Sequence, residues 1–462
     1  QQSGDDSARA RILTSQAASL EALGDTRALE SALHDALAIA ERRNDTKLLA
    51  RVHRVSALFY LWICVPERAR SHATHALELA RACGEPAEEW SANWALGVLS
   101  ALTGDTVATK GYIVEARRIA EALHSPVMRL RVDEIEIEYK SATGDWSSAV
   151  DQATKSIALA RALDQRTLLP RLLVYTGILS LGRGEIEEGK RYLDEAWSLA
   201  GAANPNDRSA DVHTIMRVYS GMAIYSLTIR EYDEAIRYGS IGLSIADRSG
   251  YTPWAVHRLL PTMIEALMWK QDFALSDFYC ARLRRDSERV GHRLGVFLAE
   301  VGESMSAMLR GTTKPLLDRI IAAADQIEAV PLAFDSARLR LEIARRHVEL
   351  GDRTGAIQQL QHAHDVLLRL GARRELEQAK AQLAELHARP RVRAATATSG
   401  VLSPREREIL RLVLEHKSNK DVGRLLSCSH RNVGKHLENA CRKLGAHTRH
   451  EAAALARERK MI

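Results

Sequence analysis

The sequence predicts an all-α protein in which a long array of paired helices precedes a small, basic, four-helix unit. Three observations lead to this fold class. Turn signals recur every 40 residues or so along most of the 462-residue chain. Small residues follow the same period. The segment after residue 400 carries helix start signals of its own and a strong positive charge. A chain of this length accommodates several domains.

The turn signals lie 40 residues apart in the first half of the chain, at Gly24-Asp25, Cys64-Val65-Pro66, Gly104-Asp105, Gly144-Asp145 and Gly184-Glu185. They continue at about the same spacing near Glu231, Gln271, Gly311 and Gly351-Asp352. Turns at such a period predict stacked repeats, each with two helices. The spacing between the last turn of the first series and the first turn of the second is longer than this period, which predicts six inserted residues. We place them in the loop 201–209.

Small residues support the same period. We expect each repeat's second helix to end near a small residue, at Ala40, Ala80, Ala120, Ala160, Ala200 and Ala246. We also expect close approach of a partner helix at Gly97, Gly177 and Gly221.

The segments 144–149 and 230–235 share a turn, an aromatic residue and an alanine three positions later, and 351–356 keeps the turn and the alanine. This pattern resembles the tetratricopeptide repeat in a long form, in about nine units. An array of HEAT-like repeats, which have a similar period, is the structural alternative. The resemblance implies a superhelix with a concave binding face.

The C-terminal segment contains four helix starts. Ser403-Pro404-Arg405-Glu406 and Thr448-Arg449-His450-Glu451 have the pattern of capping boxes, and Ser418 and Ser429 are N-cap candidates. In the third helix, an apolar stripe of Val433, Leu437, Ala440 and Leu444 is opposite Arg431, Lys435, Glu438 and Arg442. Two short helices joined by a tight turn form a helix-turn-helix, whose second helix enters the DNA major groove.

The charge distribution agrees with DNA binding. Residues 401–462 contain 14 Lys and Arg against 7 Asp and Glu, a net charge of +7, whereas the whole chain carries +6. The rest of the chain is therefore close to neutral. Basicity confined to one end indicates a nucleic-acid module attached to something else.

Several motifs in this segment resemble the LuxR-type helix-turn-helix: Leu402-Ser403-x-Arg405-Glu406, Ser418-Asn419-Lys420, Val433, His436-Leu437, Lys443-Leu444-Gly445 and Arg449-x-Glu451-Ala452. The chain departs from the family pattern at Asn432, Gly434 and Glu438. The candidate DNA-binding residues are Ser418, Asn419, Lys420, Ser429, Arg431, Asn432, Lys435, His436, Glu438, Arg442, Lys443 and Arg449.

The combination of repeats and this module resembles the large MalT-like regulators. The resemblance implies a transcription activator with promoter DNA, RNA polymerase and a small-molecule inducer as partners. It also implies a homodimer on DNA, paired through an apolar patch of Ala452, Ala453, Leu455 and Ala456. Such regulators carry an ATP-binding domain before the repeats. The chain has no GxxxxGK[ST] motif, so the ATPase either precedes Gln1 or is not needed.

We divide the chain into a sensor domain at 1–386, a linker at 387–400 and a DNA-binding domain at 401–462. The linker contains Arg389, Arg391 and Arg393 and no acidic residue. Its composition is typical of a solvated tether, with a phosphate-contacting arm as the alternative.

Aromatic and polar residues in the first helices of the repeats are candidates for inducer binding. They are Trp90, Trp94, Arg129, Arg171, Tyr175, Arg217, Tyr219, Trp254 and His257. For each aromatic, the competing interpretation is repeat packing. For the array as a whole, the alternative is binding of a regulatory protein instead of a small ligand.

Nothing in the sequence indicates an enzyme, a cofactor or a metal site. His72 and His75 share a helix face without a third ligand, and the carboxylates between 133 and 138 have the spacing of a solvated face. Neither HExxH nor GxSxG occurs. The five scattered cysteines and the lack of a long apolar run predict a cytoplasmic protein.

Overall fold

The computed structural model describes residues 2–462 except 64, 205–210, 329–331, 389–401, 403, 416, 427, 445, 447 and 460. The chain divides into two compact units, Gln1–Pro390 and Arg391–Ile462. The described residues form helices and turns and no strand, which confirms the all-α fold class. The linker that we expected at 387–400 lies outside the described residues except for its first two positions.

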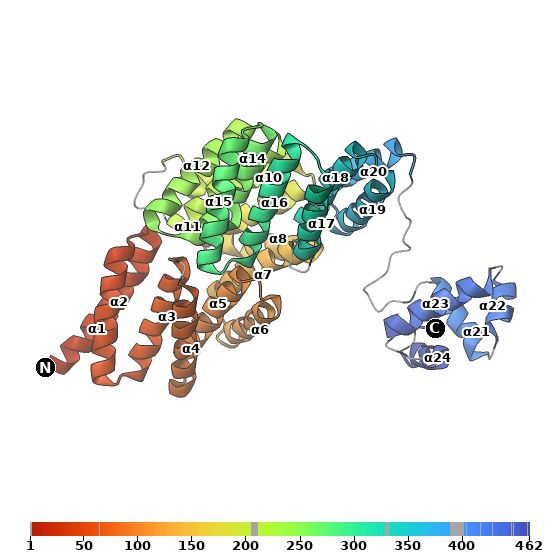
Figure 1. The fold of residues 1–462 in the computed structure, drawn as a ribbon. Helices are drawn as coiled ribbons and strands as arrows, with labels where there is room; N and C mark the ends of the chain where they lie inside the picture. Colours follow the sequence, from red (N-terminus) through yellow and green to blue (C-terminus); the bar gives the residue numbers. More distant parts are fainter. Residues whose placement is uncertain are drawn as a thin grey trace. The chain divides into compact units, whose positions relative to one another are not determined.

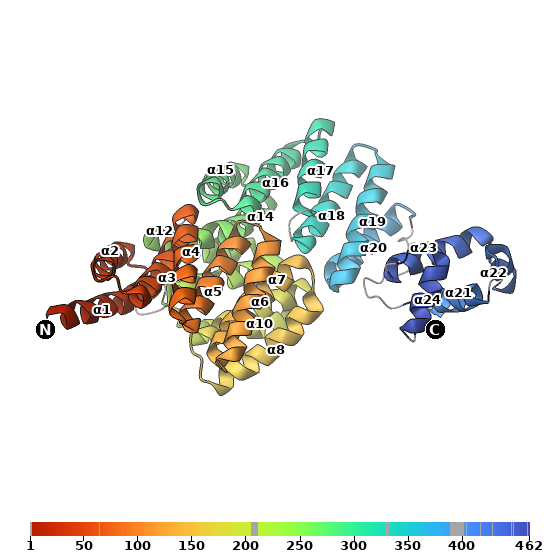
Figure 2. The same ribbon diagram turned by 90° about the horizontal axis from the view of Figure 1, so that it is seen from below.

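The first unit is an array of nine helix pairs closed by one further helix (Figures 1 and 2). Helices that are adjacent in the chain pack against each other throughout. The first six pairs are α1 (Gln2–Leu23) with α2 (Thr26–Arg43), α3 (Thr46–Trp62) with α4 (Pro66–Cys83), α5 (Pro86–Leu102) with α6 (Thr106–Ala122), α7 (Pro126–Thr143) with α8 (Trp146–Ala162), α9 (Leu168–Gly182) with α10 (Ile186–Leu199), and α11 (Val212–Thr228) with α12 (Tyr232–Ser249). In the seventh pair, the first helix consists of α13 (Thr252–Trp254), η1 (Ala255–Leu259) and α14 (Leu260–Trp269), and the second is α15 (Phe273–Val290). The last two pairs are α16 (Arg293–Arg310) with α17 (Lys314–Glu328) and α18 (Ala333–Glu349) with α19 (Arg353–Leu370), and α20 (Arg373–Glu385) follows them.

The predicted turn signals lie at the turns inside the pairs. Gly24, Gly104 and Gly144 adopt φ values of +74°, +78° and +88°, which glycine reaches without a steric penalty. The aspartate that follows each of them caps the next helix with its side chain. The Gly-Asp pair therefore ends one helix and starts the next, which explains why it recurs at the turns inside the pairs.

Two of the three glycines that we expected at close helix contacts are required there. A Cβ at Gly177 would lie 2.9 Å from the Leu193 side chain, and one at Gly221 would lie 2.6 Å from it. At Gly97 the nearest atom is 3.4 Å away, so the approach is looser. The expected insertion coincides with the long connection between α10 and α11, part of which lies outside the described residues.

The array coils so that pairs five or six positions apart come into contact. The Tyr251 hydroxyl, just before α13, donates to the Glu21 carbonyl of α1 at 2.7 Å. Farther along, Trp146 of α8 packs against Phe334 of α18 with ring centroids 5.0 Å apart. These contacts return each turn of the superhelix onto the previous one, and the first helices of the pairs surround the axis.

The first helix of the seventh pair contains a π turn. The Leu260 N–H donates to the Ala255 carbonyl, five residues back. Pro261 lacks an N–H and cannot continue the α-helical pattern, so the helix accommodates it with a wider turn. The wider turn changes the directions of His257 and Arg258, which lie within it.

The second unit comprises α21 (Pro404–Leu414), α22 (Asn419–Leu425), α23 (His430–Leu444) and α24 (Arg449–Glu458). It has its own apolar core. One expectation is wrong here: Ala452, Ala453 and Ala456 do not form an exposed patch, because all three are fully buried in this core. Only Leu455 of that set is partly exposed.

Among the described residues, no helix combines the length and the apolar character that crossing a membrane requires.

Candidate DNA-binding face and axial polar network

The helix-turn-helix of the second unit is fixed by local hydrogen bonds. Ser418 caps α22 by accepting from the Asp421 N–H at 3.3 Å. Ser429 caps α23 by accepting from the Asn432 N–H at 3.2 Å. Ser403, the first residue of the predicted capping box of α21, lies outside the described residues.

Gly423 determines how tightly the turn closes, and sequence reasoning missed it. A Cβ at this position would lie 2.7 Å from the Cys428 carbonyl oxygen, which is backbone and cannot move aside. The Cys428 N–H also donates to the Gly423 carbonyl at 2.8 Å, and this hydrogen bond holds the Cys428 backbone against Gly423. The available signal was a glycine inside a short helix, where it otherwise costs stability.

Helix α23 buries one stripe and exposes the other, as predicted. The four stripe residues, Val433, Leu437, Ala440 and Leu444, are at most 5% exposed. On the exposed side lie Asn432, Lys435 and Glu438, and His436 is half-buried. The helical positions of Arg431, Arg442 and Lys443 are described, whereas their side chains are not.

Two further candidates lie at the start of α22. Lys420 is exposed, and Asn419 is partly buried. The Arg449 guanidinium donates to Asn419 Oδ1 at 2.7 Å and to the Lys417 carbonyl at 3.1 Å. Arg449 therefore links the start of α24 to the start of α22, a role inside the unit that fixes the orientation of the Asn419 amide.

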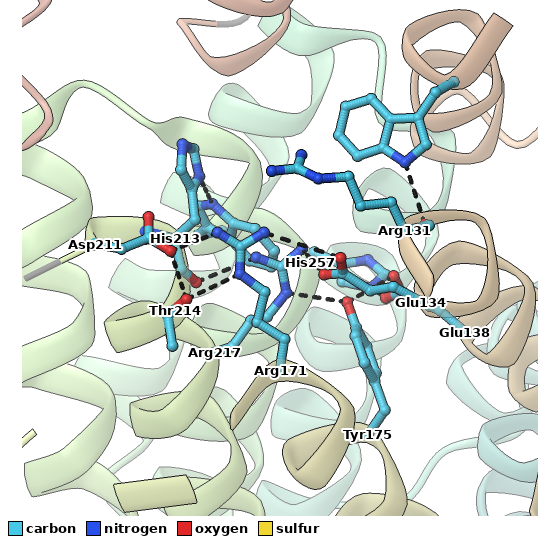
Figure 3. Close-up of polar contacts among 12 residues, drawn as sticks. Arg131, Glu134, Glu138, Arg171, Tyr175, Asp211, His213, Thr214, Arg217 and His257 are labelled. Carbon is cyan, nitrogen blue, oxygen red and sulfur yellow. Dashed lines mark hydrogen bonds and ion pairs between the residues drawn. The ribbon is translucent and has the colours of Figure 1, made fainter. Parts of the chain in front are cut away.

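In the first unit, charged and aromatic residues of consecutive first helices meet at the superhelix axis (Figure 3). We call this set the axial network. It comprises Trp94 of α5, Arg131, Glu134 and Glu138 of α7, Arg171 and Tyr175 of α9, Asp211, His213, Thr214 and Arg217 at α11, Trp254 of α13, and His257 of η1.

Glu138 joins three helices. The Tyr175 hydroxyl donates to its Oε2 at 2.9 Å, and His257 Nε2 lies 2.8 Å from its Oε1. Burial alone would raise the pKa of Glu138. The hydrogen bond to His257 and the nearby positive charges outweigh burial and lower this pKa to about 2. The carboxylate is therefore held ionised.

Glu134 is the other α7 glutamate of the axial network, and it is 2% exposed. Its Oε1 lies 2.9 Å from Arg217 Nη2, and its Oε2 lies 3.9 Å from Arg171 Nη1. Arg171 also donates to Thr214 Oγ1 at 2.8 Å and pairs with Asp211. The expectation that the α7 carboxylates form a solvated face is wrong for Asp133 and Glu134, which are 5% and 2% exposed, because Asp133 pairs with Arg117 and Ser156 and the arginines of α9 and α11 cover Glu134.

Arg217 is stacked as well as paired. Its guanidinium carbon lies 4.0 Å from the centroid of the Trp254 ring. Its Nε donates to the Tyr175 hydroxyl at 3.2 Å. The Trp254 indole N–H points toward His213 Nδ1 at 3.1 Å. Every polar group of Arg217 is thereby occupied by neighbours from the array itself.

Arg131 differs from the other two arginines. No hydrogen bond or ion pair joins its guanidinium to any residue that the structure describes, although Figure 3 shows its side chain reaching into the axial network. Burial and, second, the positive charge of Arg171 lower its pKa. Its backbone carbonyl accepts from the Trp94 indole N–H at 3.2 Å, which fixes the start of the side chain.

Six of the nine predicted ligand residues belong to the axial network: Trp94, Arg171, Tyr175, Arg217, Trp254 and His257. The other three lie elsewhere. Tyr219 packs between helices and donates to the Ala202 carbonyl at 2.9 Å. Trp90 is buried, and Arg129 is exposed.

Sequence reasoning missed Arg131, Asp211, His213 and Thr214, and it misplaced Glu134 and Glu138. A usable signal existed. Arg131, Glu134 and Glu138 are spaced by three and four residues, the spacing of a buried helical stripe. Charged residues with the spacing of a buried stripe in one helix, and again in the first helices of the next two pairs, indicate a polar interior.

A surface cavity of about 530 Å³ lies elsewhere, between α2, α3 and α4. His72 and Tyr60 line it, and His53 Nδ1 lies 2.9 Å from His72 Nδ1. Burial and two neighbouring histidines lower the pKa of His72 to about 4. None of the predicted ligand residues lines this cavity. Within the described part of the chain, no group of three potential ligands is arranged to hold a metal.

Comparison with known proteins identifies the second unit. Residues 400–456 match the family described as bacterial regulatory proteins, luxR family. A 61-residue segment is 43% identical to the transcriptional activator protein BjaR1 of Bradyrhizobium diazoefficiens. This match covers 13% of the chain and 25% of that relative. The C-terminal unit is therefore a LuxR-type helix-turn-helix domain.

The repeat array has structural neighbours at low sequence identity. A Rap protein complexed with competence and sporulation factor superposes with a TM-score of 0.58 at 12% identity, over 82% of this chain and 99% of that one. The apo form of RapI has a TM-score of 0.43 at 10% identity, over 80% and 98% of the two chains. The first similarity shows a shared fold of tetratricopeptide-like helix pairs.

Proposed function

We propose that this chain is a DNA-binding transcription regulator whose helical array binds a small-molecule inducer and thereby controls promoter binding by the C-terminal domain. The observation that carries the proposal is the LuxR-type domain, in which α23 buries an apolar stripe and presents Asn432, Lys435 and Glu438 to solvent. The chain would act by binding, without catalysis.

In the DNA complex, α23 would lie in the major groove, where Lys435 contacts a phosphate or a guanine edge. The N-terminus of α22, with Ser418, Asn419 and Lys420, would contact the backbone through its free N–H groups. Arg431, Asn432, His436, Glu438, Arg442 and Lys443 complete the proposed interface. A second copy bound to a symmetric half-site, and recruitment of RNA polymerase, belong to the same proposal.

Activation is the more favoured direction of control. The relative with 43% identity in the matched segment is named as a transcriptional activator. The similarity covers only that segment, so activation stands as part of the proposal. Measuring transcription from a bound promoter in the presence and absence of the chain would establish the direction.

The axial network supports the sensing role of the array. It brings polar groups and aromatic rings together at one interior position, and aromatic side chains with a few placed polar groups are features of small-ligand sites. The Rap protein with the same fold was solved in complex with a factor, which favours binding as the use of such an array. The alternative is a regulatory protein bound along the array, for which an extended exposed face would be needed.

The test compares the fragment 391–462 with the full chain in electrophoretic mobility shifts. The fragment should bind duplex DNA with an affinity that falls steeply with salt, because its charge is concentrated there. Its affinity should not depend on an inducer, whereas that of the full chain should. A fragment that fails to bind DNA at low salt would refute the DNA-binding role. Equal, inducer-independent affinities would refute control by the array.

A further inference from the structure

We propose that Arg131 is the anchor of the ligand site and that it binds a carboxylate group. The inference rests on the proposed sensing function, and it names the chemistry that the array would recognise. Three arginines meet in the axial network from the successive first helices α7, α9 and α11. Two of them pair directly with carboxylates of the protein, and the third forms no such pair with the residues that the structure describes.

The pairing of the other two arginines is specific. Arg217 lies 2.9 Å from a Glu134 oxygen, and Arg171 pairs with Asp211 and approaches Glu134 at 3.9 Å. Both α7 glutamates of the axial network are engaged, since Glu138 accepts from Tyr175 and contacts His257 while Glu134 pairs with Arg217. No hydrogen bond or ion pair within the described network reaches the Arg131 guanidinium, as Figure 3 shows, and the carboxylates of Glu134, Glu21 and Asp211 act on it only through longer-range attraction.

A guanidinium without a direct anionic partner is disfavoured in this position. Partial burial removes water from it and Arg171 adds like-charge repulsion, and together these outweigh the attraction of Glu134, Glu21 and Asp211, since the pKa of Arg131 is lowered. A bound anion would remove both penalties. Arginine presents parallel N–H donors that match the two oxygens of a carboxylate, so this ligand chemistry suits the free side chain better than a single-point anion.

The surroundings indicate an acid with an apolar or aromatic body. Trp94 is 9% exposed and is fixed beside the start of the Arg131 side chain by its hydrogen bond to the Arg131 carbonyl. Across the network, Trp254 stacks with Trp62 at 5.9 Å between centroids. Such a carboxylate could come from a free organic acid or from the C-terminus of a short peptide, and the two sources share the chemistry that Arg131 recognises.

The experiment measures thermal unfolding of the full chain at low salt with defined probes. Phenylacetate and its neutral counterpart phenylacetamide represent the free acid. Tetra-alanine with a free C-terminus and its amidated form represent the peptide. The variant is Arg131→Met, which keeps the length of the side chain and removes its charge. The matched control is Arg129→Met, because Arg129 lies on the same helix and is exposed.

Without a probe, Arg131→Met should raise Tm by about 2 °C or more, since it removes an unpaired charge, and Arg129→Met should leave Tm unchanged. Phenylacetate or the free peptide should then raise the Tm of the wild type and of Arg129→Met, and not that of Arg131→Met. The neutral probes should have no effect. The probe that acts at the lower concentration identifies the source.

Three results would overturn the inference. A lower Tm or a loss of folding in Arg131→Met would make the arginine a structural group. Equal shifts in Arg131→Met and the wild type would place the probe elsewhere. The absence of a shift by either acid in the wild type would exclude a carboxylate ligand. None of these results affects salt-dependent DNA binding by the fragment 391–462, so failure of this inference remains distinguishable from failure of the proposed function.

Discussion

Glu138 of α7 and His257 of η1 are 119 residues apart in the chain, yet Oε1 of the first lies 2.8 Å from Nε2 of the second. The π turn before Pro261 places His257 and Arg258 on the same carboxylate, although adjacent residues of a regular helix point in different directions. This contact joins the fourth and seventh pairs across the axis. We therefore expect the charge of Glu138 to contribute to the stability of the array.

The first prediction concerns pH. The pKa of Glu138 in the fold, about 2, lies below its ordinary value of 4.5, so the carboxylate stabilises the fold above pH 4.5 and this contribution disappears as pH falls toward 2. The difference corresponds to about 3 kcal/mol. In Glu138→Gln, the free energy of unfolding at pH 7 should fall by roughly this amount, and its dependence on pH between 5 and 2 should be weaker than in the wild type.

Denaturant unfolding followed by circular dichroism at several pH values measures this effect. Glu187→Gln is the matched control, because Glu187 is exposed on α10. Its unfolding should follow the wild-type pH dependence. Parallel curves for wild type and Glu138→Gln would show that the ionised carboxylate adds nothing to stability.

The second prediction compares two glycines of the DNA-binding domain. A Cβ at Gly434 would meet no atom within 4 Å, whereas one at Gly423 would lie 2.7 Å from the Cys428 carbonyl oxygen. Gly434→Ala should stabilise the domain by about 1 kcal/mol through helix propensity. Gly423→Ala should destabilise it by about 1–3 kcal/mol, since the turn must open. Thermal melts of the fragment 391–462 give both values. A stabilising Gly423→Ala would contradict the tight turn.

The third prediction concerns the exposed side of α23. Lys435 is exposed there, and Val433 and Leu437 on the opposite side are at most 5% exposed. If Lys435 contacts a phosphate, Lys435→Ala should weaken DNA binding several-fold and reduce the slope of log affinity against log salt by about 1. Arg411→Ala, which removes an exposed charge from α21, is the control for net charge. Equal losses of DNA affinity in both variants would show that Lys435 contributes only net charge and that α23 makes no specific contact through it.

The local parts of the fold were predictable, and the parts that depend on superhelical packing were not. The turns at Gly24-Asp25 and Gly104-Asp105 follow from backbone geometry and capping, which operate within a few residues. The burial of Glu134 depends on Arg171 of α9 and Arg217 of α11, which lie 37 or more residues farther along the chain and which no short-range pattern contains. For the same reason, neither His257 as the partner of Glu138 nor the burial of Ala452 could be read from the sequence.

The candidate sites show the same division. The buried stripe of α23 follows from helical periodicity and was predicted. The convergence of Arg171, Tyr175 and Arg217 was anticipated only as a set of ligand candidates, without their partners. Arg131 was missed because an arginine on a helix is usually solvated, and its partial burial arises from packing against helices farther along the array.

The last prediction concerns the homodimer on DNA. Ala452, Ala453 and Ala456 belong to the core of the domain, so α24 can offer a second copy mainly Leu455, which is partly exposed, with the exposed Ala454 beside it. Two-fold-related half-sites would place this surface of both copies together. The wild-type fragment should then protect two half-sites cooperatively in footprinting. Leu455→Asp, which would bring two carboxylates together at the interface, should bind a single half-site without cooperativity. Leu425→Asp is the matched control, since Leu425 is 59% exposed on α22, and it should retain cooperativity even if its affinity falls. Cooperative protection by Leu455→Asp would exclude α24 as the dimer contact.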